Sequence, residues 1–153
     1  MAKEHKDRKI VLASGVFDLL HLGHVKFLEE AKKTGGKNAE LLVIIARDST
    51  VEKTKARKPI MSENQRRALV ESLKVVDKAV LGFEDFDIQD VIAKIKPDVI
   101  ALGHDQTEME RQVRKYVDEN NLSIRVIRIG KFEDDALDSS SKIRQRIIAN
   151  FDG

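Results

Sequence analysis

The sequence contains no cysteine and no tryptophan, and it has two prolines and one tyrosine among its 153 residues. Without cysteine the protein has no disulfide, no thiolate zinc site and no cysteine nucleophile, so catalysis must use other groups. With 5% aromatic residues and a formal net charge of +2, the chain lacks the aromatic and basic clusters of a nucleic-acid binder. We therefore expect no nucleic-acid partner, whereas small anionic ligands remain possible.

Long apolar runs are also missing, because no run approaches the roughly 20 residues of a membrane-spanning helix. The N-terminal residues are polar and carry charges of both signs, which is unlike a signal peptide. We expect a cytoplasmic protein without a membrane partner. The length predicts one domain, over residues 9–150, after a polar tail over residues 1–8.

Short runs rich in Val, Ile and Leu alternate with helical segments. The runs are nearly continuous in apolar character, as in parallel strands buried on both faces, and cover residues 10–13, 41–46, 79–81, 99–102 and 124–129. Amphipathic patterns predict helices over residues 25–33, 63–73 and 108–120, and the polar, basic stretch 53–59 is interpreted as a loop. This order predicts an α/β fold, a single Rossmann-like, doubly wound domain with a five-stranded parallel sheet. Ligands of such sheets bind where the strand order reverses, which directs attention to the residues after the first and fourth strands.

The segment SGVFDLLHLGH, residues 14–24, follows the first predicted strand and leads directly into a helix. Gly15 permits a sharp turn and the close approach of a ligand, and Gly23 leaves space at the helix start. Free N–H groups and the helix dipole attract anions there. We therefore expect a phosphate group at this position.

Two histidines, His21 and His24, are three residues apart at the same helix start, so both rings can face one cleft. A neighbouring triphosphate would favour their protonated form, and their N–H groups would stabilise charge on the α-phosphate and the departing pyrophosphate. They would act as donors and not as nucleophiles. Two alternatives are that they cap the helix, with one paired to Asp18, or that they bind zinc, although no third ligand of suitable spacing follows.

The motif GVFDLLHLGH resembles the GxFDxxHxGH signature of the cytidylyltransferase-like nucleotidyltransferases. These enzymes join the phosphate of one substrate to the α-phosphate of a nucleoside triphosphate and release pyrophosphate. Lys26 matches a lysine that some members place near the triphosphate, and Arg66 matches an arginine that faces the substrate. Lys55 belongs to a basic stretch that either closes over phosphates or forms a solvated surface.

Two later segments also resemble parts of this family's site. After the fourth predicted strand, Gly103 permits close approach of a ligand, and Asp105 either binds ribose hydroxyls, a substrate group or a metal-bound water, or only forms a turn. Ser139, Ser140 and Ser141 precede a last helix that runs to about residue 150. They resemble the serine-rich helix start that holds the β- and γ-phosphates, and an ordinary N-cap is the alternative.

Over residues 10–148 the chain is most similar to the archaeal FAD synthases, adenylyltransferases that convert FMN and ATP into FAD and pyrophosphate. The segments that carry this similarity are ARDSTVEKTKARKPI, ENQRRALVESLKVVDKAVLG, KPDVIALGHDQ and DSSSKI. The resemblance implies ATP and FMN as substrates, direct in-line transfer of AMP, a divalent cation such as Mg²⁺ that bridges phosphates without a dedicated protein metal site, and a homodimer. It implies His21, His24 and Lys26 as catalytic residues. The residues implied in binding are Gly15, Val16, Phe17, Asp18, Leu22, Gly23, Lys55, Arg66, Gly103, Asp105, Ser139, Ser140 and Ser141.

Glycerol-3-phosphate cytidylyltransferases share this fold and signature and are the main alternative. Their members typically have a tryptophan after the fourth strand and an RTEGIST-like segment near the end, whereas this chain has no tryptophan and reads RIGKFEDDALDSSS. A nucleotide-sensing module without catalysis is a further alternative, but both histidines, Lys26 and the terminal serines are present. These features favour the ATP- and FMN-dependent enzyme.

Overall fold

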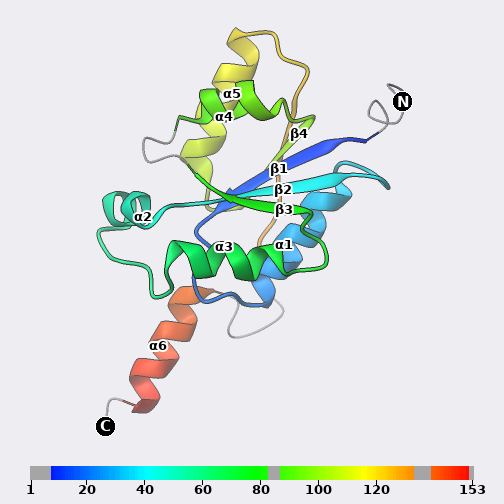
Figure 1. The fold of residues 1–153 in the computed structure, drawn as a ribbon. Coiled ribbons are helices and arrows are strands. Elements are labelled where there is room, and N and C mark those ends of the chain that lie inside the picture. The colour runs from blue at the N-terminus through cyan, green and yellow to red at the C-terminus, as the bar shows by residue number, and fades with distance from the viewer. Residues whose placement is uncertain (1–7, 83–86, 133–138, 152–153) are drawn as a thin grey trace.

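The structure is a computed structural model that describes residues 8–82, 87–132 and 139–151. Its centre is a five-stranded parallel sheet with the strand order β3-β2-β1-β4-β5 (Figure 1). The strands are β1 (Ile10–Gly15), β2 (Glu40–Ile45), β3 (Lys78–Leu81), β4 (Val99–Leu102) and β5 (Arg125–Arg128). The predicted fold class is therefore confirmed. The predicted N-terminal tail, apart from Arg8, lies outside the described residues.

Helices cover both faces of the sheet. On one face lie α1 (Leu22–Lys33) and α3 (Glu63–Glu71), and on the other lie α4 (Ile88–Ile95) and α5 (Thr107–Glu119) (Figure 1). Each face has its own apolar core, because alternate residues of β1 point to opposite sides: Val11 and Ala13 pack toward α1, and Leu12 packs toward α4 and α5. This burial on both sides explains why the strand sequences are almost continuously apolar.

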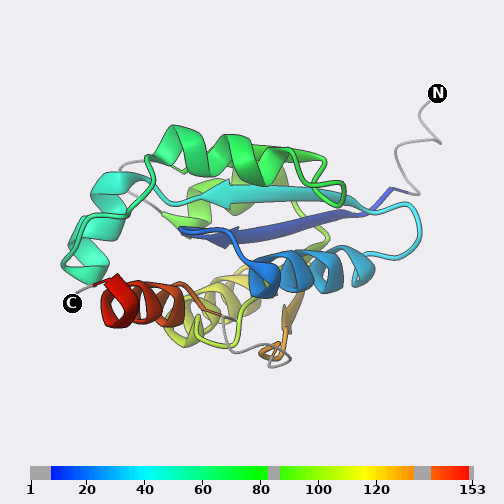
Figure 2. The same cartoon turned by 90° about the horizontal axis from the view of Figure 1, so that it is seen from below.

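Two further helices, α2 (Asp48–Lys55) and α6 (Ser140–Phe151), lie at the end of the molecule where β1 and β2 terminate (Figure 2). No helix among the described residues is long and apolar enough to cross a membrane. The strand order reverses between β1 and β4, since β2 lies on one side of β1 and β4 on the other. This confirms the switch point that was predicted after the first and fourth strands.

The structure differs from the sequence-based assignment mainly in two helices. Residues 53–55, interpreted as part of a loop, form the last turn of α2, which ends at Ala56 in the left-handed conformation with φ 53°. Val51 is the only buried residue of α2, so the helix has no apolar stripe that a periodicity analysis detects. Helix α4 was not predicted, because it spans 8 residues and is too short for a clear period.

Candidate active site

A cavity of about 860 Å³ opens at the carboxyl ends of the strands. Residues from the ends of β1, β2, β4 and β5 line it, together with residues of α1, α2, α5 and α6. Of the predicted site residues, all except Leu22 and Arg66 are among the lining residues. The fold therefore brings four separate sequence segments around one space.

The two histidines of the signature lie at the start of α1 with their rings stacked. Their ring centroids are 3.8 Å apart and the ring planes make an angle of 28°. His21 is the N-cap residue of α1, and its backbone N–H donates to Nδ1 of His24 over 3.2 Å. Because Nδ1 of His24 accepts this bond, the neutral ring carries its proton on Nε2. His24 thus caps the helix with one nitrogen and keeps an N–H donor on the other.

From the sequence, His24 is expected to be protonated beside a triphosphate, and its charge state without a ligand is different. Burial, as the largest cause, together with the neighbouring His21 and Lys55 lowers its pKa from 6.5 to about 3, against an opposing effect of Asp18. The ring is therefore neutral at pH 7 when no ligand is bound. A triphosphate would raise this pKa, because a nearby negative charge favours the protonated form.

The loop between β1 and α1 has an unusual backbone. Phe17 and Leu19 have positive φ angles of 55° and 50°, which are uncommon for residues with side chains. A Cβ atom on Gly15 would lie 2.8 Å from the ring of Phe17, so Gly15 makes room for that ring. The Phe17 ring in turn contacts His24, with centroids 5.3 Å apart. Gly15 thus leaves room for a Phe17 ring that contacts His24.

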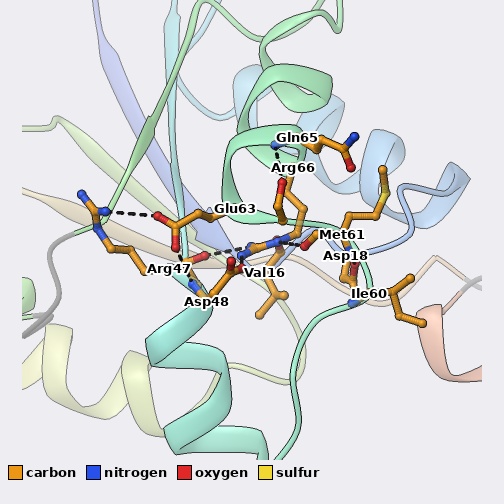
Figure 3. A network of polar contacts seen from close by, with 11 residues as sticks. Val16, Asp18, Arg47, Asp48, Ile60, Met61, Glu63, Gln65 and Arg66 are labelled. Carbon is orange, nitrogen blue, oxygen red and sulfur yellow. Dashed lines mark hydrogen bonds and ion pairs between the residues drawn. The ribbon is translucent and has the colours of Figure 1, made fainter.

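Asp18 joins three segments that surround the cavity. Its carboxylate is almost completely buried and accepts backbone N–H groups of Ile60, over 2.8 Å, and Met61, over 2.9 Å (Figure 3). Its backbone carbonyl accepts the hydroxyl of Ser140 at the start of α6, and Arg144 lies 3.9 Å from its carboxylate. These contacts show Asp18 holding the segment before α3 and the start of α6 beside the signature loop. Its carboxylate pairs with the backbone amides of Ile60 and Met61.

Arg66 is placed differently from the prediction that it faces the substrate. Its side chain is fully buried and lies outside the cavity lining (Figure 3). The guanidinium donates to the carbonyls of Met61, Val16 and Ala46 over 3.0, 2.7 and 2.8 Å, and to the Asp48 carboxylate over 2.7 Å. All of these partners lie in the segments that form the cavity. The flat, five-donor guanidinium suits this task, and it leaves Arg66 a positioning role in place of substrate contact.

Sequence reasoning also missed Gln106, which connects the two strands at the switch point. Its side-chain oxygen accepts the N–H of Gly103 over 2.8 Å, and its side-chain nitrogen donates to the carbonyl of Ser14 over 3.1 Å. Its position directly after Asp105, just beyond a buried strand, was the available signal. Gln106 ties the end of β1 to the loop after β4 beneath the cavity.

Residues 12–146 match the cytidylyltransferase-like family model. The chain belongs to this family. It is 50% identical to the FAD synthase of Methanopyrus kandleri, over 92% of each chain, and 51% identical to the FAD synthase of Ferroglobus placidus, over 92% of this chain and 88% of that one. A crystal structure titled lipopolysaccharide core biosynthesis protein, from Thermoplasma volcanium, matches with a TM-score of 0.73 and 42% identity, over 82% of this chain and 98% of that chain.

The serines that resemble the family's phosphate-binding helix start have partners within the chain. Ser139 is bonded as an N-cap, since its hydroxyl accepts the N–H of Lys142 over 3.2 Å. Ser140 donates to Asp18, and the Ser141 hydroxyl accepts from Arg144 over 3.3 Å. A hydroxyl can donate and accept at the same time, so these bonds leave capacity for a phosphate.

The remaining predicted residues of this cytidylyltransferase-like site fall into two groups. Lys26, Lys55, Gly103 and Asp105 line the cavity, with Lys26 also 3.5 Å from Glu29. Leu22 is 47% exposed at the first position of α1 and lies outside the lining. Its prediction as a lining residue does not match its position, because its side chain points to solvent where the helix leaves the cavity.

Proposed function

We propose that the protein is an FAD synthase, an FMN adenylyltransferase that moves the AMP group of ATP to FMN and releases pyrophosphate. The observation that carries this proposal is the combination of the stacked histidines at the α1 start, open to a large cavity, with FAD synthases that are 50% and 51% identical over most of the chain. The geometry supports transfer at a phosphate, and the relatives supply the identity of the two substrates.

The chemistry requires one bond to form and one to break. A phosphate oxygen of FMN attacks the α-phosphorus of ATP, and the bond from this phosphorus to the oxygen that leads to the β-phosphate breaks. The FMN phosphate is already anionic at neutral pH, so no general base is needed. Stabilisation of the charge on the transferring phosphate falls to the α1 N-terminus and to Nε2–H of His24. Ser139 to Ser141, at the α6 start, are placed to hold the leaving pyrophosphate.

We also propose that Mg²⁺ accompanies ATP. The described residues contain no group of three or more His, Cys, Asp or Glu side chains that is arranged to hold a metal ion. This fits Mg²⁺, which usually binds to substrate phosphates with one or two carboxylates and keeps several waters. Asp105, an exposed carboxylate on the cavity wall, is suited to such a water-mediated contact. When bound, the ion neutralises phosphate charge.

The proposal includes a homodimer that acts in the cytoplasm, with residues 9–150 as the catalytic domain and residues 1–8 as a tail. Exposed isoleucines on α6 support self-association, since Ile147 is 50% exposed and Ile148 is 61% exposed. Light scattering coupled to size-exclusion chromatography tests the dimer, and a monomer at assay concentration would contradict it.

A single assay tests the reaction. Purified protein with Mg²⁺ receives ATP or CTP together with FMN or glycerol 3-phosphate, in all four pairings, and both pyrophosphate and the nucleotide product are measured. We expect FAD from ATP and FMN only. CDP-glycerol would contradict the proposed substrates but retain the mechanism, and no product in any pairing would favour a sensing module.

A further inference from the structure

The cavity has two halves, one on each side of the α1 start. One half is formed by the residues after β4 and β5, including Asp105. The other half is formed by residues after β2 and β3, namely Ala46, Arg47, Thr50, Val51, Thr54, Lys55 and Gly82. This division follows from the strand order, because β1 and the signature loop separate β2 and β3 from β4 and β5.

A transfer between two phosphates needs one substrate in each half. The β4 half offers Asp105, whose carboxylate suits ribose hydroxyls, and therefore fits the nucleoside of ATP. The attacking and leaving oxygens lie roughly in line on opposite sides of the α-phosphorus. The FMN phosphate must therefore reach the α1 start on the side opposite the departing pyrophosphate, and the β2 half is the space that the nucleoside leaves for the flavin.

Thr50, in the first turn of α2, is the unusual residue of the β2 half. Its side-chain oxygen is buried and has no hydrogen-bond partner, although Thr50 lines the cavity. The nearby Thr54 shows the contrast, because its hydroxyl donates to the Thr50 carbonyl over 2.9 Å. Buried hydroxyl groups normally find a partner, so an unpaired one beside a ligand cavity indicates that a ligand provides it.

Polar contacts of Arg47, Asp48 and Glu63 hold the start of α2, the helix that contains Thr50 (Figure 3). Arg47 donates to the carbonyl of Gly82 over 2.6 Å and to Glu63 over 3.1 Å. Glu63 accepts the backbone N–H of Asp48 over 3.0 Å, and Asp48 also binds Arg66. These contacts attach the α2 start to β3 and α3. The backbone that carries Thr50 is therefore held in place before a ligand arrives.

We propose that the Thr50 hydroxyl hydrogen-bonds a polar atom of FMN outside its phosphate, and that the β2 half of the cavity holds the flavin. This inference rests on the proposed function and identifies the acceptor side of the same site. The flavin ring and ribityl chain carry both donors and acceptors, and a hydroxyl serves either. Val51, which is almost completely buried and also lines the cavity, offers apolar surface beside it.

Three variants test the inference by steady-state kinetics and thermal unfolding. Thr50→Val keeps the shape and removes the hydroxyl, Thr50→Ser keeps the hydroxyl, and Thr34→Val is the control. The control hydroxyl donates to the Ala31 carbonyl at the other end of α1, over 2.6 Å. We expect Thr50→Val to raise the KM for FMN about tenfold, a typical effect of one lost hydrogen bond, without changing the KM for ATP. Thr50→Ser should behave like the unmodified protein.

Thermal unfolding without ligand gives an independent readout. Because the Thr50 hydroxyl has no partner in the protein, Thr50→Val should leave the Tm unchanged or raise it. A lowered Tm would show that the hydroxyl is structural and would overturn the inference.

The kinetic outcomes separate the two proposals. A rise in the KM for ATP alone would place the nucleotide in the β2 half, and unchanged KM values for both substrates would show that the hydroxyl contacts neither. Either result would overturn the inference while FAD formation by the unmodified protein upheld the proposed function. Absence of FAD formation by the unmodified protein would reject the proposed function and the flavin assignment with it.

Discussion

At the scale of single residues, His24 combines two tasks on one ring. Nδ1 accepts the N–H of His21 and thereby completes the start of α1, while Nε2–H is left for the substrate. Capping and catalysis were opposed interpretations of the sequence, and the structure shows that capping occupies one nitrogen only. The two tasks can therefore be separated by substitution.

His24→Asn should separate them, because the asparagine oxygen can replace Nδ1 as the acceptor while no group replaces Nε2–H. We expect kcat to fall by about 10²–10³, as for the loss of one donor to a transition state, with little change in Tm. His24→Ala, which loses both groups, should lose stability as well. Normal kcat in His24→Asn would show that Nε2 is not the donor.

Arg66 should be essential for stability. Arg66→Ala leaves three partly buried carbonyls and a carboxylate without their partner, and we expect a loss of about 3–5 kcal/mol in the free energy of unfolding, measured with urea. The adjacent Arg67→Ala is the matched control. Arg67 forms an exposed i,i+4 pair with Glu71, worth about 0.3–0.5 kcal/mol. Similar losses in both variants would contradict the role of Arg66.

The sequence predicted which segments lie near the site better than it predicted where individual side chains point. The signature and the glycines led to segments that line the cavity, because such spacings reflect the backbone requirements of one strand-to-helix junction. The direction of Arg66 could not be read in the same way. A buried arginine and a substrate-facing arginine have the same neighbours in sequence, and the difference lies in carbonyls of Val16 and Ala46, which are distant in the chain.

At the scale of elements, the strands were predictable and the second helix was not. Burial on both faces leaves a strong apolar signal in β1, β2 and β4, and the predicted β4 has the observed bounds. Helix α2 is held by polar contacts of Arg47, Asp48 and Glu63 instead. Polar contacts between distant residues leave no periodic pattern, so the same residues resembled a loop.

The loop between α2 and α3 depends on Asp18. Asp18→Asn has one acceptor oxygen in place of two, so we expect it to weaken the bonds to Ile60 and Met61 and to release the segment before α3. Trypsin should then cleave faster after Arg57, and the free energy of unfolding should fall by about 1–3 kcal/mol. Asp87→Asn, at the start of α4, is the control. Unchanged cleavage in Asp18→Asn would show that other contacts hold the loop.

At the scale of the whole molecule, His24 makes stability depend on pH. The pKa is about 3 in the folded protein, whereas the unfolded chain has the ordinary value of 6.5. Between these values the unfolded state binds the additional proton, so acidification favours unfolding. The contribution of His24 is complete above pH 6.5 and is lost as the pH falls toward 3.

Urea unfolding at several pH values should reveal this dependence. We expect the free energy of unfolding to decrease below pH 6.5 with a slope of up to about 1.4 kcal/mol per pH unit from this residue. In His24→Asn this part of the slope should disappear. The slope that remains comes from the carboxylates that both proteins share, and it is the baseline for the comparison. Equal slopes in the two proteins would contradict a neutral, buried His24.

Gln106 has a consequence for how this architecture can be modified. Its side-chain amide connects the ends of the two central strands, β1 and β4, beyond their last backbone hydrogen bond. The amide donates to the Ser14 carbonyl of β1 and accepts the N–H of Gly103 in the loop after β4. The base of the cavity is thus closed by a side chain, which a mutation can replace, and not by the backbone. A substitution that removes this amide would leave the Ser14 carbonyl and the Gly103 N–H without this partner, while the backbone hydrogen bonds between the strands would remain.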